Sequence, residues 1–189
     1  MSDQVQEIEV KYRVLGGTDG LEAALAARGA VLSAPVRQDD QAYAPETWNY
    51  GDDKQGVSFA RLRTQDGRHL FTIKTPVANE LAVVEHETTV GDREQMHHAL
   101  LAMGFRPTMR IVKTRRTARL ESGLLGVVSV CVDEVEHAGL FVEFEAVTRT
   151  ESGEAAQEGL DVLARSLGVE LERETVTYDL LVRAAVAAV

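Results

Sequence analysis

The sequence predicts an α+β protein, mainly antiparallel β, whose strands close into a barrel with helices packed outside. Period-two alternation of apolar and polar residues marks most of the strands, and amphipathic helical patterns lie between and after them. Charged residues gather on one face of strand after strand. The 189 residues suit one domain, and no internal repeat or low-complexity tract divides them. We therefore expect a single domain over residues 1–189, with the barrel over roughly 5–149 and C-terminal helices over roughly 152–188.

The expected elements follow from these two periods. Strands are predicted over residues 5–14, 57–65, 69–76, 81–90, 109–120, 124–136 and 139–149, with a weaker candidate over 30–43. Helices are predicted around residues 21–27, from an N-cap at Asp92 to Gly104, over 152–168, and from about 177 to 188. The segment 44–56 is expected to be a surface loop that could cover a site, and Asp39 and Asp40 to lie in an exposed turn.

The composition argues against several classes of partner. Twenty Lys and Arg residues stand against 30 Asp and Glu residues, which gives a formal charge of −10. Such a field repels nucleic acid and anionic lipid, so neither is an expected partner, and a polyanion would need a local basic cluster. Cys131 is the single cysteine, which fits a reducing compartment. The first residues carry no secretory signal pattern, and we expect a cytoplasmic protein.

Charged side chains share one face of the first predicted strand. Glu7, Glu9, Lys11 and Arg13 alternate there with apolar residues. One polar face normally meets water, so a single strand of this kind means little. The pattern recurs, however, in Arg61 and Arg63, Lys74, Glu85 and Glu87, Lys113 and Arg115, Asp133, and Glu143 and Glu145. In a closed barrel these faces would converge on a lumen, whereas in an open sheet they would form one solvated face.

The residue types of that lumen indicate its ligand. Carboxylates in Glu-x-Glu pairs offer hard oxygen ligands suited to Mg²⁺ or Mn²⁺. Arg and Lys offer donors suited to phosphate oxygens. A metal-bound triphosphate or polyphosphate needs both sets side by side, because it is both a polyanion and a metal chelator.

These residues resemble the motifs of a known family. Glu7-Ile-Glu9-Val-Lys11 is similar to the N-terminal signature of the CYTH superfamily, the triphosphate tunnel metalloenzymes, which include class IV adenylate cyclases, thiamine triphosphatases and inorganic triphosphatases. The resemblance continues in the family's order over roughly residues 5–149. Its further motifs are Arg61-Leu-Arg63, Thr72-Ile-Lys74, Glu85-His-Glu87, Lys113-Thr-Arg115, Asp133 and Glu143-Phe-Glu145. One departure is Val83, where the family often has an arginine, and a His-Phe pair found in some cyclases is missing.

The resemblance implies an eight-stranded antiparallel tunnel that uses Mg²⁺ or Mn²⁺. It implies metal ligation by Glu7, Glu9, Glu143 and Glu145, with Glu85, Glu87 and Asp133 as further ligands or as supports of the ligands. It assigns phosphate contacts to Lys11, Arg61, Arg63, Lys74, Lys113 and Arg115. Catalytic roles are expected for Lys11, Glu9 and Asp133. The implied partner is a small triphosphate such as ATP, and a homodimer is allowed because relatives are often dimers.

The spacing most resembles bacterial proteins of the class IV adenylate cyclase type, which form cAMP and pyrophosphate from ATP. Hydrolysis of inorganic triphosphate, thiamine triphosphate or a nucleoside triphosphate is the alternative. A non-catalytic module that binds a nucleotide or polyphosphate is a second one. Other conspicuous residues favour structural roles: His97 and His98 a solvated helix face, and Tyr43, Trp48 and Tyr178 core packing or loop anchoring.

Overall fold

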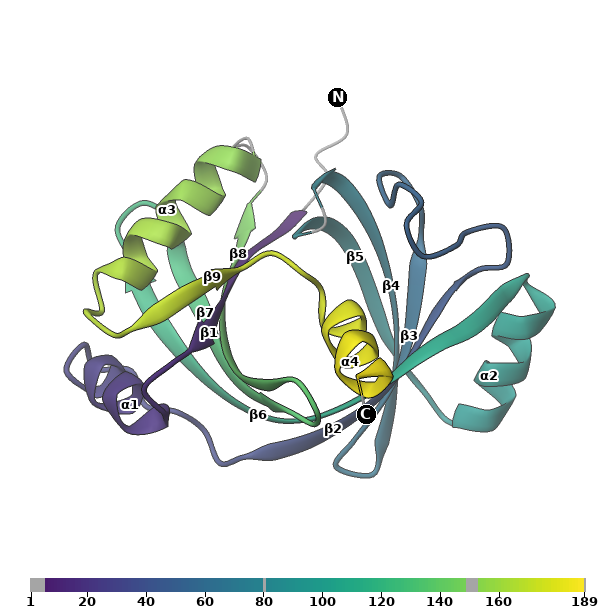
Figure 1. The fold of residues 1–189 in the computed structure, drawn as a ribbon, viewed down its shortest axis with the longest axis horizontal. Helices are drawn as coiled ribbons and strands as arrows, with labels where there is room; N and C mark the ends of the chain where they lie inside the picture. The colour runs from purple at the N-terminus through teal and green to yellow at the C-terminus, as the bar shows by residue number, and fades with distance from the viewer. Residues whose placement is uncertain (1–5, 80, 149–152, 189) are drawn as a thin grey trace.

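A computed structural model describes residues 6–79, 81–148 and 153–188. These ranges contain nine strands and four helices (Figure 1). In chain order they are β1 (Gln6–Val14), α1 (Thr18–Ala26), β2 (Val36–Pro45), β3 (Phe59–Gln65), β4 (Arg68–Asn79), β5 (Ala82–Val90), α2 (Arg93–Ala102), β6 (Phe105–Ser122), β7 (Gly126–Val135), β8 (Gly139–Thr148), α3 (Gly153–Arg165), β9 (Leu171–Glu174) and α4 (Tyr178–Ala187). None of these helices has the length and apolarity needed to cross a lipid bilayer.

The first eight strands form a closed antiparallel ring. Their order is β5-β4-β3-β2-β6-β7-β8-β1, and β1 returns to β5 through the pairs Glu7–Val83 and Ile8–Ala82. The predicted closure of eight antiparallel strands is thus confirmed. The weak candidate at 30–43 forms a strand shifted to Val36–Pro45.

The ninth strand was not predicted. β9 pairs with Lys11–Val14 of β1, along the same edge that β5 uses near the start of that strand. Its four residues, Leu-Glu-Arg-Glu, are too few to show a period, and their pairing is imposed by the edge that β1 leaves open.

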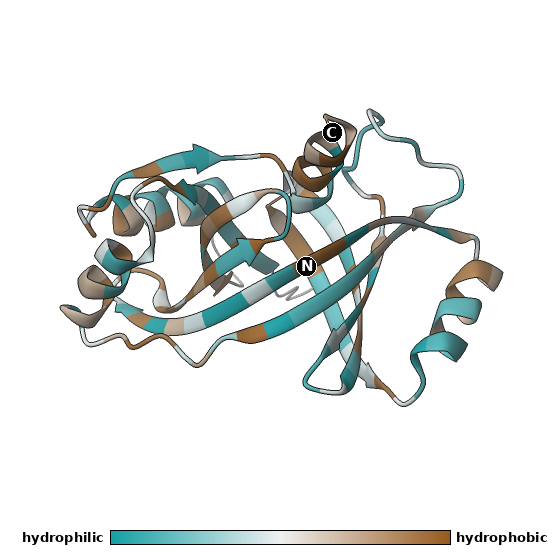
Figure 2. Ribbon diagram, turned by 60° about the horizontal axis from the view of Figure 1, so that its bottom comes forward, coloured by the Kyte–Doolittle hydropathy of each residue, from teal (hydrophilic) through white to brown (hydrophobic). Residues whose placement is uncertain are grey.

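Apolar side chains cover the outside of the ring. Ile8, Val10, Tyr12 and Val14 of β1 belong to a cluster that also contains Leu21 and Leu25 of α1 and Leu160 of α3. A second cluster joins Tyr43, Ala60 and Leu62 to Leu100 of α2. Figure 2 shows the alternation of hydrophilic and hydrophobic residues along the strands. Because the apolar face points to the helices, the charged face points into the ring.

Local signals fix the ends of α2. Asp92 caps the helix, since its Oδ1 accepts hydrogen bonds from the backbone amides of Glu94 and Gln95 at 2.9 and 3.0 Å. Gly104 follows with φ near 82°, a value that favours glycine. Of the two histidines, His98 is exposed, while His97 Nδ1 lies 2.8 Å from the hydroxyl of Tyr43.

The last helix takes a different place from the other three. Figure 1 shows α4 over the opening of the ring, at the end of the segment that follows β9. Val182 of α4 is buried in a cluster with Val135 and Phe141. Just before α4 begins, the Thr177 hydroxyl accepts a hydrogen bond of 3.2 Å from Lys54, which belongs to the loop between β2 and β3. The predicted covering loop therefore meets the start of α4.

Candidate active site

The ring encloses one cavity of about 240 Å³ whose wall is densely charged. Six basic and six acidic residues line it: Lys11, Lys54, Arg61, Lys74, Lys113 and Arg115, and Glu7, Glu9, Asp40, Glu143, Glu145 and Asp179. The charged strand faces converge here, so the alternative of an open sheet with a solvated polar face does not apply.

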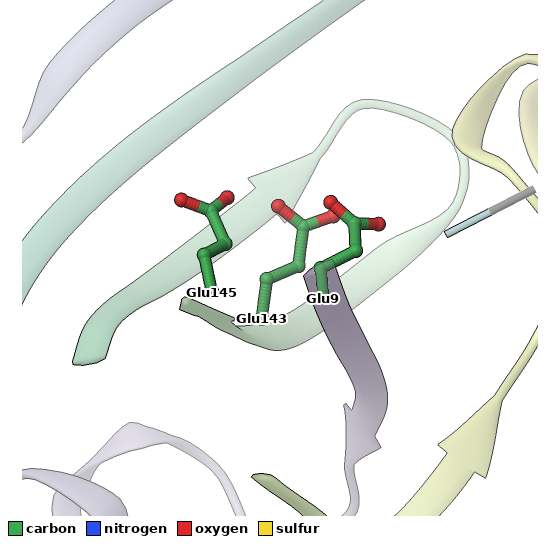
Figure 3. Close-up of side chains that lie close together, drawn as sticks. All are labelled: Glu9, Glu143 and Glu145. Atoms are coloured by element: carbon green, nitrogen blue, oxygen red, sulfur yellow. The ribbon is translucent and has the colours of Figure 1, made fainter. Parts of the chain in front are cut away.

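Three carboxylates of this wall lie together, and we call them the acidic triad. Glu9 of β1 faces Glu145 across the β1–β8 ladder, and Glu143 is two residues along β8. Each contributes an oxygen to a group whose members all lie within 4.8 Å of one another (Figure 3). Burial and the neighbouring Glu143 raise the pKa of Glu9 to about 8, and burial also raises the pKa of Glu145. Crowded, desolvated carboxylates are the donor set that a hard divalent cation binds, so these residues fit Mg²⁺ or Mn²⁺.

Asp133 organises the basic side of the site from behind the wall. Its side chain is fully buried, and it accepts hydrogen bonds from Lys113 at 2.8 Å, from Arg115 Nε at 2.7 Å and from the Tyr178 hydroxyl at 3.1 Å. Burial alone would raise the pKa of Asp133, but the two cations hold it far below its usual range. Arg115 reaches onward to Glu143 and, at 3.4 Å, to Glu145. Asp133 therefore fixes two cations beside the acidic triad.

Lys11 differs from the other cations of the wall. The residue is only 1% exposed, yet within the described ranges its ammonium makes no hydrogen bond or ion pair. The ammonium instead makes a cation–π contact with the ring of Tyr178, whose centroid lies 4.4 Å from Nζ. Lys11 thus has no direct ion pair within the described ranges, although its charge acts on the Glu9 carboxylate and partly offsets the rise of the pKa of Glu9.

The opposite part of the ring carries a second set of ion pairs. Lys74 contacts Glu7 at 3.2 Å and also pairs with Glu85. Arg61 donates to Thr72 at 3.1 Å and to Glu87 at 3.3 Å. The side chain of Glu87 is 39% exposed. Nearby carboxylates, Glu7 and Glu85 among them, outweigh burial and raise the pKa of Lys74, so Lys74 stays charged.

Asp40 was missed by the sequence reasoning, which placed it in an exposed turn. That prediction is wrong, because residues 39 and 40 lie in the middle of β2 and Asp40 is 4% exposed. Its oxygens accept two hydrogen bonds of 2.7 Å from Arg63, which is therefore committed to a buried bidentate pair. The alternation of Gln38, Asp40 and Ala42 on one face of the strand was the signal that could have revealed it.

The structure gathers most, but not all, of the predicted site residues on one surface. Glu7, Glu9, Lys11, Arg61, Lys74, Lys113, Arg115, Glu143 and Glu145 line the cavity. Arg63, Glu85, Glu87 and Asp133 do not belong to the cavity wall, and each pairs with an opposite charge. Tyr43, Trp48 and Tyr178, for which packing or loop anchoring was favoured over a contact with a ligand, also line the cavity. The role of each residue in metal binding or catalysis remains a prediction.

Comparison with known structures places the fold. A protein of Pyrococcus horikoshii superposes with a TM-score of 0.74 at 24% identity, covering 94% of this chain and 99% of that one. A proposed adenylate cyclase from Vibrio parahaemolyticus gives 0.74 at 21% identity, over 94% and 97% of the two chains. A Hippeastrum protein described as a proposed adenylyl cyclase with a dominant triphosphatase activity gives 0.62 at 17% identity, over 95% of both chains. At these identities the likeness shows the fold alone.

The family is shown by the sequence itself. A search of curated proteins by sequence gave no match. The model of the CYTH domain, in contrast, matches residues 5–178, which include all eight strands of the ring and every residue of the acidic triad. The chain therefore belongs to the CYTH domain family.

Proposed function

We propose that this chain is a divalent-metal-dependent enzyme that acts on a triphosphate held in the cavity, and that it converts ATP to cAMP and pyrophosphate in the manner of class IV adenylate cyclases. One observation carries the proposal. The same cavity holds three crowded carboxylates and, in Lys11, a buried ammonium that forms no ion pair with any described residue. A metal-bound triphosphate supplies the cation that the first group needs and the anion that the second needs.

The acidic triad is the proposed metal site. Glu9, Glu143 and Glu145 would hold Mg²⁺ or Mn²⁺, with Glu7 next along the same face of β1. A bound divalent ion would neutralise negative charge that develops on the phosphate oxygens during the reaction.

The basic residues are proposed to take the phosphates by exchanging partners. Arg115 is now shared by Asp133, Glu143 and Glu145. If Glu143 and Glu145 held a cation, they would release the guanidinium, and Asp133 would keep it in place with donors free for phosphate oxygens. Lys11 needs no exchange, because it has no ion pair to break in the part of the chain that the structure describes. Metal and triphosphate should consequently bind more tightly together than either binds alone.

The reaction itself is an in-line displacement at phosphorus. In cyclisation, the ribose 3′-oxygen forms a bond to the α-phosphorus, the bond to the bridging oxygen breaks, and pyrophosphate leaves with the basic residues around it. In hydrolysis, water attacks the terminal phosphorus instead. The fold shared with the Hippeastrum protein, whose description names a triphosphatase activity, keeps hydrolysis as the second candidate.

The products distinguish these reactions. Purified protein is incubated with ATP and either Mg²⁺ or Mn²⁺, and the nucleotides and phosphates are separated. Equal amounts of cAMP and pyrophosphate support cyclisation, ADP and phosphate support hydrolysis, and tight binding without product supports a non-catalytic module. Absence of metal-dependent triphosphate binding would refute the whole proposal.

A matched pair of variants tests the metal site. Glu145→Gln removes one charge from the acidic triad, whereas Glu136→Gln removes one from a surface ion pair with Arg37 whose side chains are more than half exposed. We expect only Glu145→Gln to raise the metal concentration needed for half-maximal turnover.

A further inference from the structure

The first residue of α4 reaches the basic side of the cavity. Tyr178 lines the cavity, although it follows the last strand of the ring in the chain. The centroid of its ring lies 4.4 Å from Nζ of Lys11 and 4.9 Å from Nζ of Lys113. Its hydroxyl donates a hydrogen bond of 3.1 Å to Asp133, which also accepts one from Lys113. A single side chain of α4 therefore contacts two buried lysines and the carboxylate that anchors one of them.

The position of the Tyr178 ring is fixed by the residues behind it. The ring meets that of Phe141 at a centroid distance of 5.2 Å and an angle of 66° between the planes. Further along α4, Val182 is buried in a cluster with Val135 and Phe141. The face of an aromatic ring attracts an ammonium group but does not neutralise its charge. Tyr178 can therefore hold a lysine side chain in place and leave its charge available to a phosphate.

Tyr178 gives Lys11 the contact that fixes the position of its ammonium. Lys11 is 1% exposed and forms no ion pair with any residue that the structure describes. Its charge acts on Glu9 of the acidic triad. Without the ring, the buried ammonium would lack a fixed partner, and we expect it to turn toward that carboxyl group. An aliphatic residue at position 178 would fill the space against Phe141 but would not prevent this movement.

A second set of contacts holds α4 to the loop between β2 and β3. Lys54 of this loop donates a hydrogen bond of 3.2 Å to the Thr177 hydroxyl. The guanidinium of Arg183 lies 3.9 Å from the centroid of the Tyr50 ring, and we call this contact the latch. Arg183 is exposed, and neither residue of the latch lines the cavity. The latch can therefore be weakened without changing a residue of the cavity wall.

We propose that Tyr178 is a positioning residue, which holds Lys11 and Lys113 for the phosphates only while α4 is docked over the opening of the ring. The inference rests on the proposed function, in which these lysines contact a triphosphate, and extends it by giving α4 a part in binding. Ligand binding and the docking of α4 are then linked, so that a bound triphosphate stabilises the docked helix. The latch contributes to the same docking equilibrium.

Hydrogen exchange of the α4 amides, followed by mass spectrometry, tests the inference without requiring turnover. Exchange is measured in Mg²⁺ with and without inorganic tripolyphosphate or ATP, and calorimetry gives the dissociation constants. The proteins are the unmodified chain, Tyr178→Phe, Tyr178→Leu, Arg183→Ala, Arg183→Lys and Arg28→Ala. Arg28→Ala is the matched control, because it also removes an exposed arginine that joins two segments. Arg28 donates a hydrogen bond of 2.6 Å to the Ser166 carbonyl, between the segments that follow α1 and α3 and outside the cavity wall.

We expect a bound triphosphate to slow α4 exchange in the unmodified chain and in Tyr178→Phe, which keeps the ring, but not in Tyr178→Leu. The dissociation constant should rise at least about 5-fold in Tyr178→Leu and change less than about 2-fold in Tyr178→Phe. In the ligand-free protein, Arg183→Ala should speed α4 exchange by about 2- to 5-fold, the factor that an exposed cation–π contact gives. Arg183→Lys, which keeps a cation over the Tyr50 ring, and Arg28→Ala should leave α4 exchange unchanged.

Three results would overturn the inference and leave the proposed function intact. The first is a bound triphosphate that does not slow α4 exchange in the unmodified chain. The second is equal slowing in Tyr178→Leu and Tyr178→Phe at saturating ligand. The third is α4 exchange in Arg183→Ala no faster than in Arg28→Ala. If the unmodified chain binds neither triphosphate, the proposed function fails instead.

Discussion

Replacing Lys11 by methionine should separate binding from stability. Methionine keeps an unbranched, flexible side chain, one atom shorter than lysine, and removes the charge. In the present structure Lys11 is 1% exposed, and its ammonium faces the Tyr178 ring and forms no ion pair with the residues that the structure describes. The substitution therefore removes a charge whose proposed partner is the substrate.

The expected loss of triphosphate affinity is large. A hydrogen bond to a charged group contributes about 1.5–3 kcal/mol, which corresponds to roughly 10- to 150-fold in the dissociation constant. The free energy of unfolding should change by less than about 1 kcal/mol, because relief of a desolvated, unpaired charge offsets the loss of the contact with the Tyr178 ring.

Lys113→Met is the informative comparison. Lys113 is also buried and also lies near Tyr178, at 4.9 Å, but it forms a 2.8 Å ion pair with Asp133. Breaking one side of a buried pair costs about 3 kcal/mol or more, so this variant should be markedly less stable. Urea unfolding and calorimetric titration with ATP and Mg²⁺ measure both quantities. Equal destabilisation by the two variants, or a change in affinity below 3-fold for Lys11→Met, would refute the assignment of Lys11 as the free phosphate ligand.

Three further predictions follow from the site. Glu9→Gln should raise the thermal midpoint of the metal-free protein by about 2–4 °C per kcal/mol of relieved repulsion. It should also reduce the rise in thermal midpoint that Mg²⁺ produces. Scanning calorimetry with and without metal measures both effects, and a lowered metal-free midpoint contradicts the prediction. Asp40→Asn should cost about 3 kcal/mol, since it leaves the Arg63 guanidinium buried. Burial opposes the ionised form of Asp40, but Arg63 lowers the pKa of Asp40 below 3.8. The stabilisation is therefore present above about pH 4 and is lost as the pH falls through the folded-state pKa. Urea unfolding of both proteins should show a smaller difference in stability at pH 3 than at pH 7, and an undiminished difference argues against the ion pair. Tyr178→Phe keeps the ring beside Lys11 and should leave KM for the triphosphate unchanged, whereas Tyr178→Leu removes the ring and should raise KM. Equal KM values for the two variants would exclude a positioning role for the ring.

Strand periodicity predicted the ring because inside and outside differ along every strand. Ile8 and Val10 face the helices, and Glu9 and Lys11 face the cavity. The motifs with charges at alternate positions therefore gave correct faces for β1, β6 and β8. Prediction failed where pairing is set by the rest of the fold. β9 forms because β1 offers an edge, and Asp40 is buried because Arg63 lies opposite it across the β2–β3 ladder.

The sequence could not show which charges already neutralise one another. Arg61, Arg63 and Arg115 are the same residue type in similar motifs. In the structure, however, Arg63 forms an ion pair with Asp40, while Arg115 forms ion pairs with two members of the acidic triad. Likewise, Lys11 and Lys113 both lie near the Tyr178 ring, but it is Lys113 that forms an ion pair with Asp133. These differences depend on register between strands that lie far apart in the sequence.

The stability of such a charged interior rests on its outer layer. A buried ion pair contributes little net free energy, because desolvation offsets attraction. The apolar clusters beneath α1, α2 and α3 are built on the outer face of the strands, so the hydrophobic core is separate from the charged cavity wall. Imperfect pairing is then tolerated within the ring: among the described residues the acidic triad forms ion pairs with Arg115 only, and Lys11 forms none. A ligand that carries both a cation and an anion would pair with these unmatched charges. An all-apolar interior would be more stable, but it would offer no charges to bind such a ligand.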